Sequence, residues 1–169
     1  MKELFIYIVV PLIISNVLHM VIVKKNFFSS LATPVSVKLF GQNKTWRGFV
    51  IVPLLNAFLL SMINLIWPYL SNPRALIIGF LLGIAYMLFE LPNSYLKRRL
   101  GIGPGVNAGN LRWLLMLIDK TDSSFGVSLF SYFLLDLGLV QFLQLFLISV
   151  LTHIFFSLIL VATGIKKSF

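Results

Sequence analysis

The sequence predicts an all-α integral membrane protein, and two observations carry that prediction. Of the 169 residues, 59% are hydrophobic, and the mean hydropathy is +0.96, whereas ordinary soluble domains are nearer to half apolar. The apolar residues also form runs of about 20, the length that a helix needs to cross a bilayer core of roughly 30 Å. We therefore expect about five transmembrane helices, two polar cytoplasmic loops between them, and a single domain over residues 1–169.

The expected spans follow the apolar runs along the chain. The first run has no Ala-x-Ala-like cleavage site after it, so we expect a retained span rather than a signal peptide. In the third run, Gly79 and Gly83 form a Gly-x-x-x-Gly pattern, which lets helices approach closely. That face should pack on a neighbouring helix or on another subunit, and a homodimer is one form such packing can take. The five spans are residues 4–23, 49–67, 75–89, about 120–135 and about 139–162.

The start of the fourth span has two interpretations. Residues 111–118 are apolar but too short to cross a bilayer alone. They form either an interfacial segment before the span or the beginning of one longer helix whose Asp119 and Asp122 line a cavity. Both interpretations place the two aspartates where water can reach them.

Charge predicts the orientation of the chain. The connections at 24–48 and 93–120, taken with the C-terminus, hold twelve of the fourteen Lys and Arg residues, which leaves Lys2 and Arg74 on the opposite side. The positive-inside rule then makes these loops cytoplasmic and the N-terminus external, in the inner or plasma membrane of the cell. Because the net charge of +9 sits between apolar spans, we expect lipid headgroups and phosphates as partners and no nucleic acid. The absence of cysteine excludes thiolate catalysis and disulfides.

Three of the five acidic residues lie between positions 90 and 122, and they suggest a metal site. Asp119 and Asp122 are three residues apart, so on a helix they share one face. Mg²⁺ prefers carboxylate oxygens and usually bridges to substrate phosphates. The alternative is that one aspartate caps the fourth span at its N-terminus. Glu90, at the expected end of the third span, should face a polar cavity or the cytoplasmic boundary because a buried charge is costly in a membrane.

Cations on the same side complete the pattern. Lys97, Arg98 and Arg99 are adjacent, and Lys44 and Arg47 lie between two glycines. Such cations serve as a topology signal, but they can also hold phosphates, while glycine lets the backbone approach an anion. Together with the carboxylates, they make a phosphoryl- or nucleotidyl-transfer site plausible.

Three segments carry a resemblance to a known family. Residues 43–48 read Asn-Lys-Thr-Trp-Arg-Gly, residues 90–99 read Glu-Leu-Pro-Asn-Ser-Tyr-Leu-Lys-Arg-Arg, and residues 118–123 read Ile-Asp-x-x-Asp-Ser. In this order and spacing they resemble the CDP-archaeol synthase family, a branch of the membrane cytidylyltransferases that includes the CDP-diacylglycerol synthases. The resemblance implies an enzyme that uses CTP and Mg²⁺ to convert a phosphorylated glycerolipid, an archaeol-type phosphate or phosphatidate, to a CDP-lipid with release of pyrophosphate.

Two departures from the family pattern bear on this resemblance. The acidic residue expected after Pro34 is replaced by Val35-Ser36-Val37, so any role for that acid is missing or reassigned. The His-Gly-Gly element that precedes the paired aspartates in the bacterial diacylglycerol branch is absent. The second departure favours the archaeol-type branch.

The resemblance and the charge pattern together predict roles for individual residues. Asp119 and Asp122 are assigned to Mg²⁺, and Glu90 is ranked behind them as an acid that orients a cation. Polar contacts to the nucleotide are expected from Asn43, Thr45, Asn93 and Ser94. The cations expected to hold CTP or lipid phosphates during catalysis are Lys44, Arg47, Lys97 and Arg98.

Two other functions stay open from the sequence. A CTP-dependent kinase of polyprenols or other lipids would need the same metal and cations, but it would release CDP and a phosphorylated alcohol. A small membrane transporter or scaffold would more often show two similar halves, and the sequence shows no such repetition.

Overall fold

The computed structural model describes residues 2–103 and 112–165, without the side chains of Arg112, Trp113 and Met116. Within these residues the regular secondary-structure elements are all helical, and a single isolated β-bridge joins Pro34 to Thr45. The first helical stretch is continuous and consists of α1 (Lys2–Leu4), the π-helical η1 (Phe5–Val9) and α2 (Val10–Lys24). The remaining elements are η2 (Ser29–Leu31), α3 (Val37–Phe40), α4 (Trp46–Ile66), α5 (Asn72–Arg99), α6 (Arg112–Leu134) and α7 (Leu139–Ala162).

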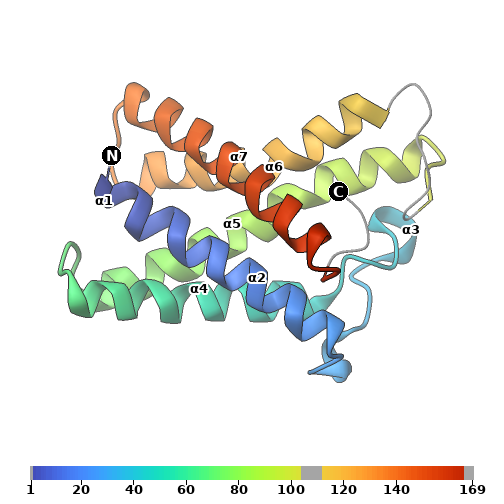
Figure 1. Ribbon diagram of the computed structural model, residues 1–169, viewed down its shortest axis with the longest axis horizontal. Coiled ribbons are helices and arrows are strands. Elements are labelled where there is room, and N and C mark those ends of the chain that lie inside the picture. The colour runs from blue at the N-terminus through green and yellow to red at the C-terminus, as the bar shows by residue number, and fades with distance from the viewer. Residues whose placement is uncertain (1, 104–111, 166–169) are drawn as a thin grey trace.

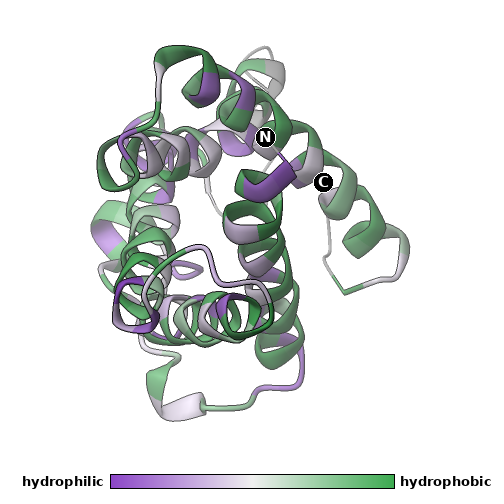
Figure 2. Ribbon diagram, turned by 90° about the vertical axis from the view of Figure 1, so that its left-hand side faces the viewer, coloured by the Kyte–Doolittle hydropathy of each residue, from purple (hydrophilic) through white to green (hydrophobic). Residues whose placement is uncertain are grey.

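The predicted all-α integral membrane fold is confirmed. Four helical stretches are long and apolar enough to cross a bilayer, namely Lys2–Lys24, Trp46–Ile66, Asn72–Arg99 and Leu139–Ala162. The fifth long helix, α6, has 23 residues, and its first half carries four charged residues. α6 is continuous from Arg112, which favours the interpretation of one longer helix over that of a separate interfacial segment before the fourth span. Residue 111 lies outside the described residues. Most of the helical ribbon is hydrophobic when seen along the helices (Figure 2).

The long helices run side by side, so the connections gather at two ends of the molecule (Figure 1). One end holds the N-terminus and the turns before α5 and α7. The other, here called the loop end, holds residues 24–45, 97–103, 112–122 and 163–165. At the loop end Lys24 Nζ donates a hydrogen bond of 3.0 Å to the carbonyl of Gly164, which ties α2 to the end of α7. The described parts of the predicted polar connections therefore lie at one end of the molecule, and the side of the membrane that this end faces stays a prediction.

The predicted close packing at Gly79 and Gly83 is made within the chain. A Cβ at Gly79 would lie 2.8 Å from Cα of Ala57, and a Cβ at Gly83 would lie 2.5 Å from Cα of Pro53. The two glycines therefore let α5 lie directly against the backbone of α4, and this face is used by a neighbouring helix.

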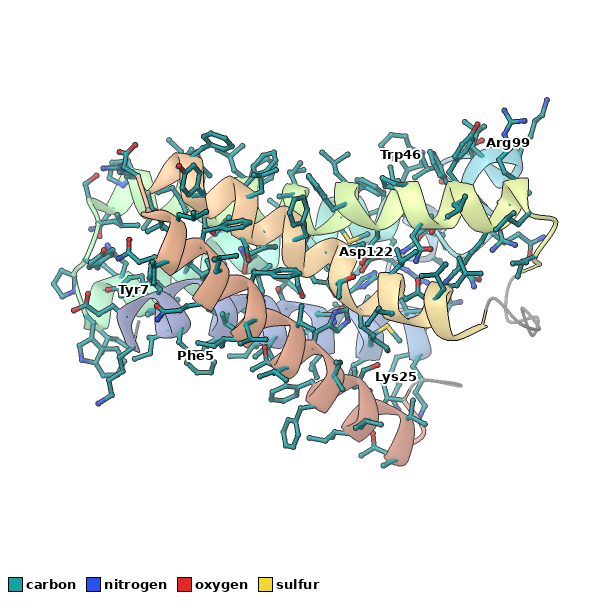
Figure 3. The ribbon with its side chains drawn as sticks, turned by 90° about the horizontal axis from the view of Figure 1, so that it is seen from above. Phe5, Tyr7, Lys25, Trp46, Arg99 and Asp122 are labelled. Carbon is teal, nitrogen blue, oxygen red and sulfur yellow. The ribbon has the colours of Figure 1, made fainter. Side chains whose placement is uncertain are left out.

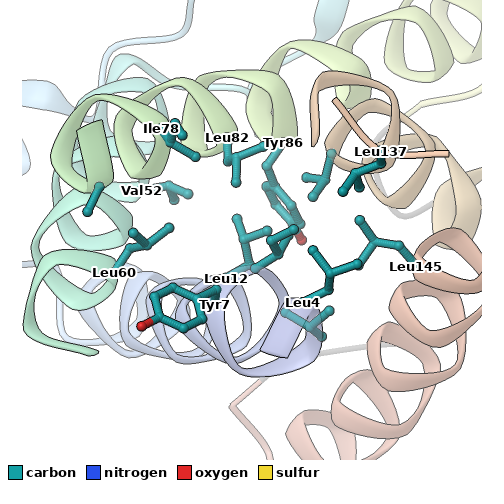
Figure 4. Packing of buried hydrophobic residues seen from close by; sticks show 14 of the residues in the cluster. Leu4, Tyr7, Leu12, Val52, Leu60, Ile78, Leu82, Tyr86, Leu137 and Leu145 are labelled. Atoms are coloured by element: carbon teal, nitrogen blue, oxygen red, sulfur yellow. The ribbon is translucent and has the colours of Figure 1, made fainter. Parts of the chain in front are cut away.

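A buried apolar cluster joins the helices away from the loop end (Figure 4). It draws side chains from the first helical stretch, α4, α5, α6, α7 and the turn before α7. Large apolar side chains also remain exposed along the helices, which is the surface expected to meet lipid. The labelled cluster members are Leu4, Tyr7, Leu12, Val52, Leu60, Ile78, Leu82, Tyr86, Leu137 and Leu145.

The expected boundary between the third span and the second polar loop is wrong. Glu90 does not close the helix, because α5 continues through Pro92 to Arg99, so Asn93, Ser94 and Lys97 are helical. Proline removes one hydrogen bond inside a helix but does not always end it, and leucine, lysine and arginine are good helix formers. Cations in the last turn also interact favourably with the helix dipole. The correction matters for function because it places these side chains on a rigid element.

Candidate active site

Lys44 and Glu90 join two of the three sequence segments. The ammonium of Lys44, in the connection before α4, forms an ion pair with Oε2 of Glu90 on α5, and each side chain is 21% exposed. Burial alone would lower the pKa of Lys44, but the nearby Glu90 carboxylate outweighs burial and raises the pKa above its ordinary value. Lys44 therefore stays charged at neutral pH. Glu90 thus holds the Lys44 ammonium in place, and its predicted role in the site stays a prediction.

The backbone around Lys44 is held on both sides. The Val35 amide donates to the carbonyl of Lys44 over 2.8 Å, and the Trp46 amide donates to the carbonyl of Thr33 over 3.0 Å. These bonds form a short two-stranded contact just before α4 begins. The position of the Lys44 ammonium is thus set by backbone pairing as well as by Glu90.

Asp119 connects the third segment to α5. Its Oδ2 lies 2.5 Å from Nζ of Lys97, and its Oδ1 accepts a hydrogen bond from the side-chain amide of Asn93. Asn93 is 3% exposed, whereas the side chain of Asp119 is 50% exposed. One face of Asp119 is therefore fixed by α5, and the other is open to a ligand.

Asp122 lies one helical turn further along α6, beside the same group of charges (Figure 3). Its Oδ1 accepts a hydrogen bond of 2.6 Å from the backbone amide of Ser123. The carboxylates of Glu90 and Asp119 both act electrostatically on Asp122, and so does the Lys44 ammonium. Both aspartates belong to the body of α6, so the alternative in which one caps the start of a span at residue 120 is not what the structure shows.

Arg47 and Arg98 contact the protein's own backbone. Arg47 is 6% exposed, and its Nη1 donates to the carbonyl of Phe27 over 3.1 Å. Arg98 Nη1 donates to the carbonyl of Ile102, and the guanidinium lies over Gly41. In this structure both arginines hold the connections at the loop end, and their predicted contacts to phosphate stay predictions.

The three other predicted polar contacts differ in how they are placed. Asn43 is exposed at the loop end, and Thr45 precedes α4 without a side-chain capping bond. Ser94 donates from its hydroxyl to the carbonyl of Glu90 over 3.0 Å, one turn back along α5. Asn43 and Thr45 therefore lie at the loop end with their predicted contacts to a nucleotide still predictions, while Ser94 is turned toward its own helix.

Sequence reasoning missed the aromatic and imidazole groups around Glu90. Tyr86 lies one turn before Glu90 on α5, and its side chain is placed beside Glu90 and Ser123. His19 on α2 and His153 on α7 both act electrostatically on the Glu90 carboxylate. The i, i+4 spacing of Tyr86 and Glu90 was a visible signal, because such positions share a helix face. No sequence signal linked the two histidines, which come from distant helices.

Two curated relatives match the chain, and both carry the name CDP-archaeol synthase. The protein of Staphylothermus marinus is 35% identical over 124 residues, which cover 73% of this chain and 60% of that protein. The chain belongs to the CDP-archaeol synthase family. The protein of Pyrococcus furiosus is 35% identical over 75 residues, 44% of this chain and 45% of that protein.

The match to these CDP-archaeol synthases is partial in length. The aligned part of the chain spans less than two thirds of each relative. No protein-family model matches the chain, and no solved structure matches it. The family resemblance predicted from three short segments is confirmed by the longer alignment.

The donor set of this CDP-archaeol synthase homologue suits a metal that is shared with a substrate. Among the described residues no group of three His, Cys, Asp or Glu side chains could by itself hold a metal ion. Asp119 and Asp122 provide two carboxylates on one helix face, and Asp119 is half exposed. Mg²⁺ commonly uses one or two carboxylates and takes its other ligands from phosphates and water. The pair fits that pattern better than an all-protein metal cage.

Proposed function

We propose that the protein is a Mg²⁺-dependent CTP:phospholipid cytidylyltransferase that converts a phosphorylated glycerolipid to a CDP-lipid. The carrying observation is that the three segments that resemble the family converge at the loop end, where Lys44 meets Glu90 and Asp119 meets Lys97. Two curated relatives named CDP-archaeol synthase support this activity and favour an archaeol-type phosphate as the lipid.

The proposed reaction needs little acid–base help from the protein. The second pKa of a phosphate monoester is about 6, so the lipid phosphate is largely dianionic at neutral pH. One of its oxygens attacks the α-phosphorus of CTP and forms a new P–O bond. The bond from the α-phosphorus to the oxygen that bridges to the β-phosphorus breaks, and pyrophosphate leaves with those electrons. The site must therefore supply positioning and charge neutralisation.

The residues at the loop end can supply both requirements. Lys44 and Lys97 come from different elements, and each is held by a carboxylate, so their ammonium groups are pre-positioned near the entry of a polyphosphate. Asp119 and Asp122 would hold Mg²⁺, which supplies charge stabilisation on the phosphate oxygens when bound. Asn93 fixes the rotamer of Asp119 through its side-chain amide.

The site's surroundings agree with a substrate that lives in a membrane. The loop end joins helices that are apolar along most of their length. By the positive-inside rule we place the loop end in the cytoplasm, where CTP is made, and the N-terminus outside, in the inner or plasma membrane. A soluble nucleotide would then enter from the loop end and a lipid from the bilayer.

The decisive experiment uses CTP labelled at either the α- or the γ-phosphorus. Purified protein is incubated with Mg²⁺, each labelled CTP and one acceptor, which is archaeol phosphate, phosphatidate or an unphosphorylated lipid alcohol. A cytidylyltransferase transfers the α-label to lipid and releases the γ-label as pyrophosphate. Transfer of the γ-label to an unphosphorylated lipid alcohol would instead identify a CTP-dependent kinase. No CTP binding in the presence of Mg²⁺ would favour a transporter or scaffold.

A further inference from the structure

The chain that leaves α2 folds back onto the end of that helix. The Phe27 amide donates a hydrogen bond of 3.0 Å to the carbonyl of Ile22, and the Asn26 amide donates one of 3.1 Å to the carbonyl of Val23. Asn26 has φ +56°. A left-handed residue with bonds of this kind is a common end for a helix, because it satisfies carbonyls that the last turn leaves free. Phe27 is therefore held beside the last turn of α2.

This turn presents two aromatic rings to its surroundings. Phe27 is 59% exposed and Phe28 is 60% exposed. Phe28 also has φ +53°, a left-handed conformation that asparagine adopts fairly often but that bulky side chains rarely adopt. Such a strained residue persists only where the surrounding structure maintains it, and strained residues concentrate at functional positions. The turn therefore combines a costly backbone conformation with two exposed apolar rings.

The position of the turn along the chain and its charge indicate what these rings meet. The turn directly follows Lys2–Lys24, a stretch long and apolar enough to cross a bilayer. Lys24 and Lys25 are exposed beside the rings at the loop end (Figure 3). Phenylalanine next to lysine is typical of segments that lie at the boundary between headgroups and acyl chains, where lysine is attracted to anionic lipids. The turn therefore suits the anionic surface of the bilayer.

A second copy of the chain fits this surface less well than a bilayer does. In a twofold dimer the same patch meets itself, so Lys24 and Lys25 of one copy would face the same lysines of the other. Like charges placed opposite each other disfavour such a contact. An anionic headgroup has the complementary charge, and the acyl chains below it can cover the rings of Phe27 and Phe28.

Arg47 joins the turn to the candidate active site. Its Nη1 donates a hydrogen bond of 3.1 Å to the carbonyl of Phe27, and the side chain is 6% exposed. Arg47 is the second residue of α4, and Lys44 precedes it by three positions. The position of the turn therefore affects Arg47 at the start of α4 as well as the end of α2.

We propose that residues 24–28 anchor the loop end to anionic headgroups of the bilayer and thereby hold Arg47 in position. Phe27 and Phe28 enter the layer between headgroups and acyl chains, and Lys25 pairs with a lipid phosphate. These five residues are called the membrane anchor below. Binding of the anchor to anionic lipid is independent of the proposed function, whereas an effect of the anchor on cytidylyl transfer rests on that function.

The first test measures lipid binding through stability. The midpoint of thermal unfolding of the full chain in detergent is followed as phosphatidylglycerol is added, an anionic lipid without the terminal phosphate that a substrate needs. A ligand that binds the folded state raises this midpoint, whereas phosphatidylcholine and inorganic phosphate should raise it little. Lys25→Gln should increase the phosphatidylglycerol concentration needed for half of the effect by about fivefold, the scale of one lysine at an anionic surface. Lys38→Gln is the control, because Lys38 is an exposed lysine on α3 at the same end.

A second variant separates anchoring from folding. Phe28→Asn removes one ring and suits φ +53° better, so without lipid its unfolding midpoint should be equal to or higher than that of the unsubstituted protein. Its response to phosphatidylglycerol should nevertheless weaken. A lower midpoint with an unchanged lipid response would assign Phe28 a structural role only and overturn the anchor. Trp67→Asn is the control, because Trp67 is an exposed ring at the opposite end of the molecule.

The second test measures transfer of the α-label in nanodiscs of phosphatidylglycerol or phosphatidylcholine. Transfer should be faster in the anionic bilayer, and Lys25→Gln and Phe28→Asn should remove most of that difference. Equal transfer in the two bilayers would refute the link to Arg47. Unchanged phosphatidylglycerol response in both variants, or a dimer of the unsubstituted protein that Phe28→Asn dissociates, would overturn the anchor. If the lipid response depends on the anchor but no α-label reaches lipid, the proposed function fails and the anchor stands.

Discussion

The ammonium of Lys97 lies 2.5 Å from Oδ2 of Asp119, so a cation of the protein occupies a carboxylate that is assigned to Mg²⁺. The same carboxylate accepts a bond from Asn93 on its other oxygen. If Asp119 holds Mg²⁺ as proposed, Lys97 and the metal ion would compete for its carboxylate, and a bound polyphosphate would relieve that competition by pairing with Lys97. On the proposed function, this contact would link metal binding to nucleotide binding through one side chain.

Removal of that competition should strengthen metal binding in the absence of nucleotide. In Lys97→Met, we expect the affinity for Mn²⁺ without CTP to rise by about twofold to fivefold, the range that corresponds to an exposed ion pair. Cytidylyl transfer should nevertheless fall, because the phosphates lose a cation. Electron paramagnetic resonance titration of Mn²⁺ measures the first effect, with Arg99→Gln as the control. Weaker Mn²⁺ binding in Lys97→Met would show that Lys97 supports the metal site instead of competing with it.

The ion pair between Lys44 and Glu90 should be measurable as a coupling in stability. Because both side chains are mostly buried, loss of either partner should cost between about 1 and 3 kcal/mol, above the range for exposed pairs and below that for fully buried ones. Lys44→Met with Glu90→Gln should cost less than the sum of the single changes. Unfolding by titration with SDS in mixed micelles gives these free energies, and Lys38→Met supplies an exposed control. Strictly additive losses would argue against the pair.

The membrane fold could be predicted from the sequence because each span is recognised from a single continuous run of residues. A span needs about 20 apolar residues, and the last one was predicted at the bounds that the structure has, Leu139–Ala162. The C-terminal end of α5 could not be predicted in the same way. Residues 93–99 are mostly polar and follow Pro92, a pattern typical of a loop, yet they are helical, and Asn93 and Lys97 bond to Asp119 on α6.

The sequence indicates which residues could form the candidate site, but it does not indicate which of them contact one another. Spacing on one helix showed that Asp119 and Asp122 share a face. It could not show that Lys44 pairs with Glu90, since the two residues are 46 positions apart and the chain between them folds into two packed helices.

The connection that carries Lys44 depends on a glycine that packs against Arg98. Gly41 has φ +83°, and a Cβ there would lie 2.9 Å from Nε of Arg98. Gly41→Ala should therefore lower stability by more than the cost of backbone strain alone, about 1–2 kcal/mol, and it should reduce turnover by displacing Lys44. Gly101→Ala is the matched control, because Gly101 has φ +72° and open space around its Cβ position. Equal effects of the two changes on stability and turnover would show that the Arg98 contact is unimportant.

The close approach of α4 and α5 should tolerate no added volume at Gly83. A Cβ at this position would lie 2.5 Å from Cα of Pro53, which is backbone and cannot move aside. Gly83→Ala should destabilise the protein by about 1–3 kcal/mol, the usual range for overpacking. Unfolding in SDS measures the loss. Gly138→Ala is the control, because the nearest atom to its Cβ position is 3.7 Å away, and a loss as large there would remove the packing explanation.

The two aspartates of α6 should be essential for transfer but not for folding. Asp119→Asn keeps an oxygen that can accept from Asn93, and Asp122→Asn keeps one that can accept from the Ser123 amide, so both variants should remain monodisperse in detergent. Each should lower CDP-lipid formation by about a hundredfold or more, the scale on which loss of transition-state charge stabilisation acts. The rate is measured across a series of Mg²⁺ concentrations, because partial recovery at high Mg²⁺ would indicate weakened metal binding. Asp136→Asn is the control: Asp136 lies at the opposite end with φ +49°, a conformation that asparagine also adopts. Normal turnover by Asp119→Asn or Asp122→Asn would remove that residue from the metal site.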